Sequence, residues 1–137
     1  MKKCVSAVLC IALALSICTH ATAATPDELW LAAESLREQG IMVGDQTGSL
    51  HLDDSLTRAE LAAILCRLRV NQEHIAAEEA LYTRYCTFPD VPEWARVYVG
   101  YCAFNGLMVG YDTGAFGTSD SVTPAAACTV VLRHLGI

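Results

Sequence analysis

Lysine is almost missing from this chain of 137 residues, and the two lysines present are Lys2 and Lys3. After residue 23 the strong cations are seven arginines, set against fifteen Asp and Glu residues, so the net charge there is about −8. An acidic chain is repelled by nucleic acid and by anionic membrane surfaces. We therefore expect neither as a main partner, and an anionic ligand would need a cation placed locally.

Metal-binding spacings are also lacking, because the chain has no Cys-x-x-Cys motif and no Cys/His cluster. The histidines at 51, 74 and 134 are scattered, with no nucleophile at a motif spacing, and Cys86 with His74 is only a weak candidate pair. We therefore expect no metal, no cofactor and no catalytic residues.

The first residues have the pattern of an export signal. Lys2 and Lys3 precede an apolar run from Val5 to Ile17, and Ala21-Thr22-Ala23 has the small residues of a cleavage site. The apolar run is short for a membrane span. We predict a signal peptide at 1–23, a secreted product without a membrane span after cleavage, and a single domain at 24–137.

Four cysteines follow the predicted signal: Cys66, Cys86, Cys102 and Cys128. An even number in an exported chain permits disulfides, and four cysteines allow three pairings. Cys66, Cys102 and Cys128 fall on apolar faces of expected helices, which favours buried free thiols. Sequence alone leaves both alternatives open.

An internal repeat organises the rest of the chain. Residues 40–59 (GIMVGDQTGSLHLDDSLTRA) align with residues 106–125 (GLMVGYDTGAFGTSDSVTPA), and half of the positions are identical. The identical positions are mostly glycines and turn residues, so the repeat predicts a shared backbone path.

Each copy is expected to form a helix, a loop and a second helix. Thr25-Pro26-Asp27-Glu28 and Asp90-Val91-Pro92-Glu93 are typical helix starts. Gly40 and Gly106 suit the left-handed position after a helix, with Ile41 and Leu107 folding back as in a Schellman motif. The second helices begin at Thr57 and Thr123. We predict a mainly α fold of two repeats, about 25–70 and 88–137, packed as a small incomplete pseudo-symmetric bundle. The connector, 71–87, is expected to carry one extra helix packed by Ile75, Leu81 and Tyr82.

The two copies differ at the start of the second helix, where the first has Thr57-Arg58-Ala59-Glu60 and the second has Thr-Pro-Ala-Ala. Thr57 and Glu60 predict a capping box, which is a structural role. Arg58 opposes the helix dipole by roughly 0.3 to 1 kcal/mol, so we expect an anion beside it. That anion is either a bound carboxylate or phosphate, or the nearby Asp53 or Asp54.

Both copies resemble S-layer homology motifs, which run from F-x-D-V-P through a tryptophan-alanine helix and a G-I-x-x-G loop to T-R-A-E. The second copy has Phe88-Pro89-Asp90-Val91-Pro92, Trp94-Ala95 and Gly106 to Gly110, and the first has Gly40 to Gly44 and Thr57-Arg58-Ala59-Glu60-Leu61. The first copy lacks the F-x-D-V-P start, and the second lacks the arginine and glutamate. The family usually has three motifs, whereas this chain has two copies.

The resemblance implies a non-catalytic module that anchors exported proteins to the cell wall or cell surface, including S-layers, by binding secondary cell-wall polysaccharide with a pyruvate ketal. The arginine of T-R-A-E would meet the ketal carboxylate in a groove between motifs. Carried over to this chain, the ligand-binding residues are Arg58, Glu60, Asp90, Trp94, Gly110 and Tyr111.

Two alternatives stay open. A degenerate module could retain the fold for protein–protein assembly at the cell surface, with a second copy or another motif-bearing protein as partner. Trp94, spaced helically with Val97 and Tyr101, is also typical of a core residue. The contrast between Arg58 and Pro124 nevertheless predicts one ligand site, at Arg58, with charges whose main use lies outside the fold.

Overall fold

The computed structural model describes residues 25–45 and 47–136. These residues form six helices and no strand, apart from one isolated bridge between Thr57 and Ser121. The helices are α2 (Pro26–Glu38), α3 (Arg58–Arg69), α4 (Gln72–Ala77), α5 (Glu79–Tyr85), α6 (Glu93–Phe104) and α7 (Pro124–Leu135). The prediction of a mainly α fold is confirmed, whereas the predicted signal peptide lies outside the described residues. None of the six helices is long and apolar enough to cross a membrane.

The chain divides into two compact units, and the division falls between Glu34 and Ser35, inside α2. In the first unit the predicted helix start is present: the Glu28 carboxylate accepts hydrogen bonds from the Thr25 backbone N–H (2.7 Å) and the Thr25 hydroxyl (2.9 Å). The arrangement is reciprocal, because the Thr25 hydroxyl accepts the Glu28 N–H at 3.3 Å, and it satisfies donors that a helix start leaves unpaired. The C-terminal unit, Ser35–Ile137, contains the remaining five helices.

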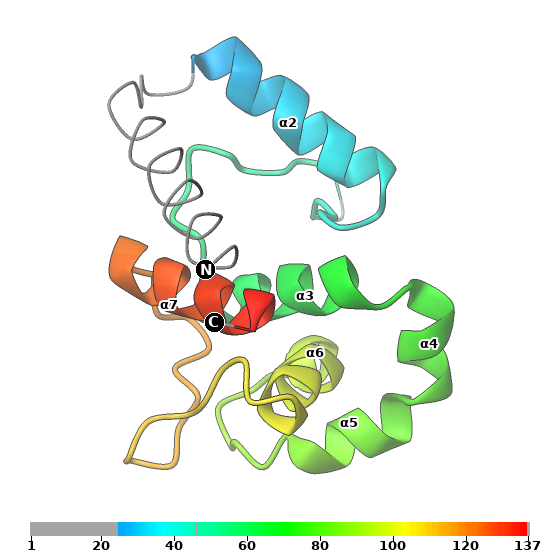
Figure 1. Ribbon diagram of the computed structural model, residues 1–137, viewed down its shortest axis with the longest axis vertical. Helices are drawn as coiled ribbons and strands as arrows, with labels where there is room; N and C mark the ends of the chain where they lie inside the picture. Colours follow the sequence, from blue (N-terminus) through cyan, green and yellow to red (C-terminus); the bar gives the residue numbers. More distant parts are fainter. Residues whose placement is uncertain (1–24, 46, 137) are drawn as a thin grey trace, which may run out of the picture. The chain divides into compact units, whose positions relative to one another are not determined.

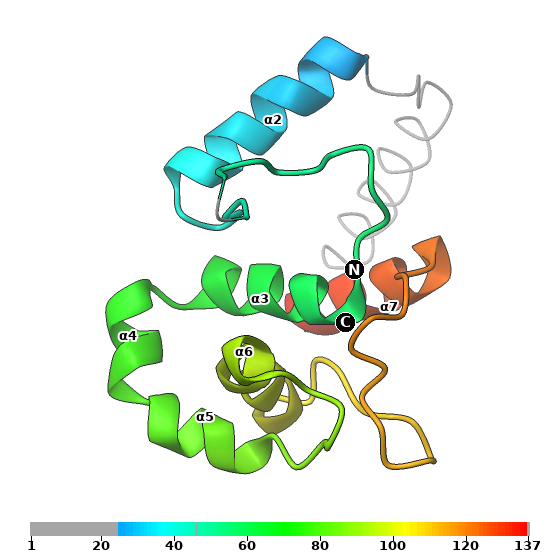
Figure 2. The same ribbon diagram turned by 180° about the vertical axis from the view of Figure 1, so that it is seen from behind.

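The core of the C-terminal unit lies around α6, which packs against α3 on one side and α5 on the other (Figures 1 and 2). Val99, Leu107 and Phe116 are among its largest fully buried side chains. The connector forms two short helices, α4 and α5, where the sequence predicted one. Ile75 and Tyr82 are buried as expected, but Leu81 is exposed.

All four described cysteines are free thiols. Cys66, Cys86 and Cys102 are buried, and burial raises the pKa of the Cys66 thiol to about 12. The apolar spacing was wrong for Cys128, which is exposed on α7. Buried thiols of raised pKa carry little thiolate, so they act as small apolar side chains.

The loops of the two copies have matching backbone hydrogen bonds, with each bond of the first loop repeated 66 positions later in the second. Ile41 N–H donates to the Leu36 carbonyl and Leu107 N–H to the Cys102 carbonyl, each at 2.9 Å, after Gly40 and Gly106 in the left-handed conformation. These are the predicted helix ends. The N–H of residues 45, 48 and 54 and of residues 111, 114 and 120 likewise donate to matching carbonyls.

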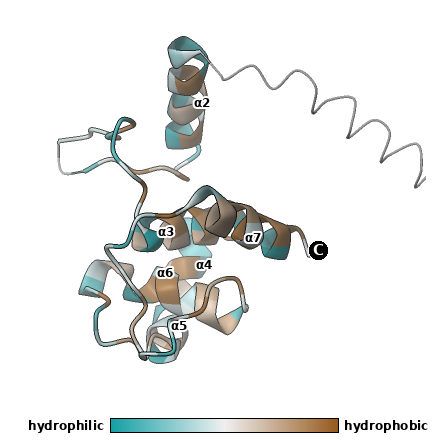
Figure 3. Cartoon of the chain, turned by 90° about the vertical axis from the view of Figure 1, so that its left-hand side faces the viewer, coloured by the Kyte–Doolittle hydropathy of each residue, from teal (hydrophilic) through white to brown (hydrophobic). Residues whose placement is uncertain are grey.

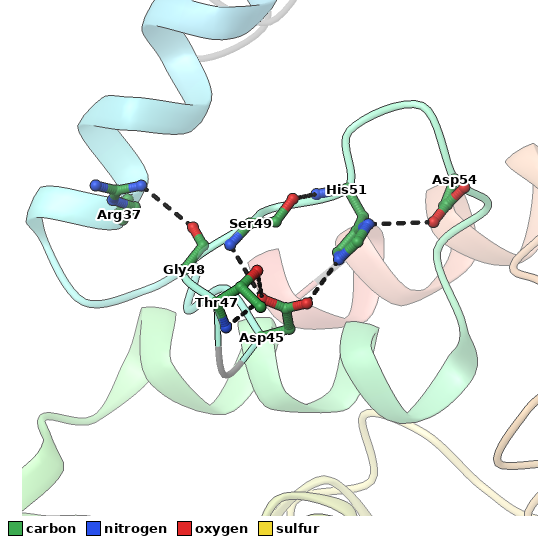
Figure 4. Close-up of polar contacts among 7 residues, drawn as sticks. All are labelled: Arg37, Asp45, Thr47, Gly48, Ser49, His51 and Asp54. Atoms are coloured by element: carbon green, nitrogen blue, oxygen red, sulfur yellow. Dashed lines mark hydrogen bonds and ion pairs between the residues drawn. The ribbon is translucent and has the colours of Figure 1, made fainter.

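His51 takes the place that a left-handed glycine, Gly117, has in the second loop; their φ angles are 48° and 75°. A non-glycine residue is strained in this conformation. Its ring is held between two carboxylates, with Nε2 2.9 Å from Asp45 Oδ2 and Nδ1 3.6 Å from Asp54 Oδ2 (Figure 4). The Asp45 carboxylate also accepts hydrogen bonds from Thr47 and Ser49.

We predict that this loop is held most firmly in mildly acidic solution. The hydrogen bond to Asp45 raises the pKa of His51 above 6.5, and the bonds from His51 and Thr47 lower the pKa of Asp45 below 3.8. The His51 contribution is fully present below about pH 6.5 and is lost as pH rises through its raised pKa, whereas that of Asp45 is present above about pH 3.8.

An NMR titration of the His51 ring should therefore show a midpoint above 6.5. The Asp45→Asn variant removes the charged partner and should lower this midpoint toward the ordinary value. An identical midpoint in both proteins would contradict the pairing.

Candidate functional site

The start of α3 is built by a complete capping box. The Thr57 hydroxyl accepts the Glu60 N–H at 3.3 Å, and the Glu60 carboxylate accepts the Thr57 N–H at 2.8 Å. The predicted structural role of these two residues is confirmed. Because the Glu60 carboxylate already has these partners, its use by a ligand would compete with the helix start.

Arg58 joins this helix start to the loop of the second copy. Its Nε donates to the Phe116 carbonyl (2.9 Å) and its Nη2 to the Val109 carbonyl (2.8 Å). The guanidinium carbon lies 4.8 Å from the ring centroids of both Tyr111 and Phe116. Arg58 therefore has a role within the fold that the sequence did not predict, and its partners are carbonyls and rings instead of Asp53 or Asp54.

Backbone bonds strengthen the same junction. Arg58 N–H donates to the Asp120 carbonyl at 2.9 Å, Ala59 N–H to the Thr118 carbonyl at 3.2 Å, and Val122 N–H to the Leu56 carbonyl at 2.8 Å. Arg58 is thus held by hydrogen bonds of both its backbone N–H and its guanidinium group. A guanidinium has five N–H donors, and carbonyls use two of them in Arg58. The other donors and the positive charge are therefore held in a fixed place where an anion could bind.

A small cavity of about 140 Å³ adjoins Arg58. It is lined by two arginines and five uncharged residues: Arg58, Arg133, Met108, Val109, Ala126, Thr129 and Val130. The Arg133 Nη1 lies 3.4 Å from the Leu107 carbonyl. Sequence reasoning missed Arg133, although the alignment of the copies pairs it with an arginine 66 positions earlier, Arg67.

Asp90 orders the loop beside this cavity. Its carboxylate accepts the N–H groups of Phe116 (2.8 Å), Gly117 (2.8 Å) and Thr118 (3.1 Å). Partial desolvation opposes ionisation, yet these bonds prevail and lower the pKa of Asp90 to about 2. Asp90 therefore supports the loop that Arg58 contacts, with its carboxylate turned to backbone amides.

Gly110 and Tyr111 belong to the same loop, as predicted. A Cβ on Gly110 would lie 2.3 Å from the Phe88 ring, so the loop packs too closely there for another residue. The Tyr111 hydroxyl donates to Asp120 Oδ2 at 2.9 Å, and the side chain is 46% exposed beside the Arg58 guanidinium. Arg58, Asp90, Gly110 and Tyr111 are thus brought together through one loop.

Trp94 is placed elsewhere. It lines a groove with residues of α4 and α5 that shares no residue with the Arg58 cavity. Its side chain is 54% exposed, so the interpretation as a core residue is wrong. Helical spacing placed the core face of α6 on the side of Trp94 and Val97, whereas the fully buried residues of the helix are Ala95, Val99 and Cys102.

Comparisons with known proteins point to the bacterial cell surface. The chain is 28% identical to a middle cell wall protein of Brevibacillus brevis and 29% identical to a surface layer protein of Brevibacillus choshinensis, each match covering 99% of the chain. It is 33% identical to cell surface glycoprotein 1 of Acetivibrio thermocellus over 67% of the chain. No family model matches the chain, and no solved structure does.

These relatives are much longer proteins, and the matches span only 14%, 13% and 4% of their lengths. All three are proteins of the cell wall or cell surface by name. The similarity agrees with the predicted secreted location at the cell wall or cell surface.

Proposed function

We propose that the chain is a non-catalytic module that anchors exported protein to the cell wall by binding an acidic secondary cell-wall polysaccharide, such as a pyruvylated glycan. The observation that carries this proposal is the cavity shared by Arg58 and Arg133. Two guanidinium groups at one cavity of a chain with net charge −6 are an arrangement suited to an anion.

The volume and lining of the cavity favour a small acidic substituent over a whole sugar ring. Its volume of about 140 Å³ is well below the range of roughly 300 to 1,000 Å³ that is usual for complete small-molecule sites. A pyruvate ketal combines a carboxylate with a methyl group. The arginines would bind the carboxylate, and Met108, Val109 and Val130 offer apolar contacts for the methyl group.

Arg133→Gln is the cleanest test, because Arg133 is exposed near the end of α7 and its bond to the Leu107 carbonyl is long. Purified protein should sediment with wall sacculi that retain their polysaccharide, and Arg133→Gln should reduce the affinity about tenfold, the effect of losing one charge-assisted hydrogen bond. Arg84→Gln is the matched control, since Arg84 also lies in the last helical turn of its helix.

Sacculi stripped of polysaccharide complete the test. Equal sedimentation of wild type and Arg133→Gln, or undiminished sedimentation with stripped sacculi, would refute the assignment of the cavity. Loss of binding in Arg84→Gln as well would show only a general charge effect.

A second candidate function is assembly with another protein chain. It is favoured by exposed apolar residues on α7, where Val131, Leu132 and Leu135 are 47%, 47% and 64% exposed. Figure 3 shows hydrophobic stretches, in brown, along α7. Clustered exposed apolar residues are typical of interaction surfaces. A strictly monomeric protein in light scattering would argue against assembly between copies of this chain.

A further inference from the structure

A groove that contains Trp94 lies in the C-terminal unit and shares no residue with the cavity at Arg58. Its volume is about 350 Å³, within the range of small-molecule sites. It lies between α4 and α5 on one side and α6 on the other, and is lined by Gln72, Ile75, Ala76, Glu79, Thr83, Glu93, Trp94, Val97 and Tyr98.

One wall of this groove is aromatic and firmly supported. Trp94 presents a half-exposed indole, and Tyr98 lies one turn further along α6. The Tyr98 hydroxyl accepts a hydrogen bond from Arg67 Nη2 at 2.8 Å, and the Arg67 guanidinium carbon lies 4.6 Å from the Tyr98 ring centroid. A flat apolar platform on a packed helix is suited to the face of a sugar ring.

The charges of the groove are opposite to those at Arg58. Its charged lining residues are Glu79 and Glu93, in the first turns of α5 and α6, and its uncharged polar residues are Gln72 and Thr83. Two carboxylates repel a phosphate or the carboxylate of a pyruvate ketal, whereas they attract an ammonium group. An indole face adds to that attraction, because cations bind over tryptophan more strongly than over other rings.

We propose that this groove is a second glycan subsite that binds an amino sugar with a free amine. The sugar ring packs on Trp94, the ammonium group pairs with Glu79 and Glu93, and Gln72 and Thr83 hydrogen-bond the hydroxyls. This inference rests on the proposed function only in taking wall glycan as the ligand. It assigns the acidic and the basic units of such a glycan to separate places on the chain.

Tryptophan fluorescence tests this subsite directly. The chain has two tryptophans, so in a Trp30→Phe background the signal comes from Trp94 alone. A tetramer of glucosamine should give a saturable change in emission. The tetramer of N-acetylglucosamine, which has the same ring without the charge, should bind at least about tenfold more weakly.

Variants identify the charged partners. Replacing both Glu79 and Glu93 by Gln should weaken glucosamine-tetramer binding at least about tenfold, since the variant loses the charge-assisted hydrogen bonds to the ammonium group. Glu73→Gln is the matched control, because Glu73 lies on α4 but does not line the groove.

Three results would overturn the proposal: no saturable change with the glucosamine tetramer, equal affinity for the acetylated tetramer, or equal or tighter binding of tetralysine, which would indicate a basic peptide as ligand. Arg133→Gln should leave the fluorescence response unchanged. A response that persists while sacculus binding is insensitive to Arg133 would therefore refute the acidic site alone, and the reverse pattern would refute this subsite alone.

Discussion

Gly100→Ala is expected to destabilise the protein by about 3 kcal/mol or more, through overpacking of the core. Gly100 is buried within α6, and a Cβ there would lie 1.8 Å from the Tyr82 carbonyl oxygen and 2.6 Å from its carbon. Both atoms belong to the α5 backbone, which cannot move aside like a flexible side chain. The substitution would force α5 and α6 apart along their main contact.

The sign of this effect makes it a sharp test. In an unconstrained helix, alanine is more favourable than glycine by about 1 kcal/mol, so propensity alone predicts a more stable variant. Urea unfolding followed by circular dichroism distinguishes the two. Ala103→Gly, in the same helix, measures the propensity term by itself, with an expected loss of about 1 kcal/mol. A higher unfolding midpoint for Gly100→Ala would show that α5 and α6 do not approach this closely.

The ends of the helices could be predicted from sequence because they depend on chemistry within a few residues. The capping box at Thr57 and Glu60 and the left-handed glycines at 40 and 106 are formed as expected. Their hydrogen bonds join groups three to five positions apart, so the residue type nearly determines the geometry. The helical class followed from the same signals together with apolar spacing.

The partners of Arg58 could not be predicted in that way. Its hydrogen bonds to Val109 and Phe116 connect residues 51 and 58 positions apart. Such contacts depend on which loop approaches the helix start, and spacing within one element contains no such information. For the same reason, spacing within α6 or α7 could not show that Arg133 lines the cavity at Arg58 while Trp94 lines another groove.

The difference between Arg58 and Pro124 now has a structural explanation. Arg58 uses its backbone N–H for the Asp120 carbonyl and its side chain for the second loop. Proline has no N–H and no guanidinium, so α7 begins with a residue that cannot repeat this junction. The helix start itself is retained, because the Thr123 hydroxyl accepts the Ala126 N–H at 3.2 Å.

Arg58→Ala is accordingly expected to weaken the fold as well as ligand binding. The variant loses two charge-assisted hydrogen bonds to carbonyls and the contacts with the rings of Tyr111 and Phe116. A partly buried group of this kind contributes roughly 2 to 4 kcal/mol, counting about 1.5 to 3 for hydrogen bonds of a charged group and about 0.5 to 1 for the cation–π contacts. Two carbonyls would also be left without this donor.

Urea unfolding measures the loss of stability, and hydrogen exchange of the amides at 116–118 reports on the loop itself. These amides bond to Asp90, so they should exchange faster in Arg58→Ala if Arg58 and Asp90 hold the loop together. Arg58→Lys retains the charge without the planar guanidinium, so its stability and its amide exchange rates should lie between those of Arg58→Ala and wild type. Arg84→Ala should change stability by less than about 0.5 kcal/mol, as is usual for exposed positions.

The comparison with Arg133→Gln then separates the two roles of Arg58. If sacculus binding is lost in both variants but stability only in Arg58→Ala, the cavity binds the ligand and Arg58 additionally maintains the junction. Unchanged stability and unchanged exchange in Arg58→Ala would instead show that the loop is held by Asp90 and the backbone bonds alone. In that case the main role of Arg58 would be at the ligand site, as its contrast with Pro124 predicts.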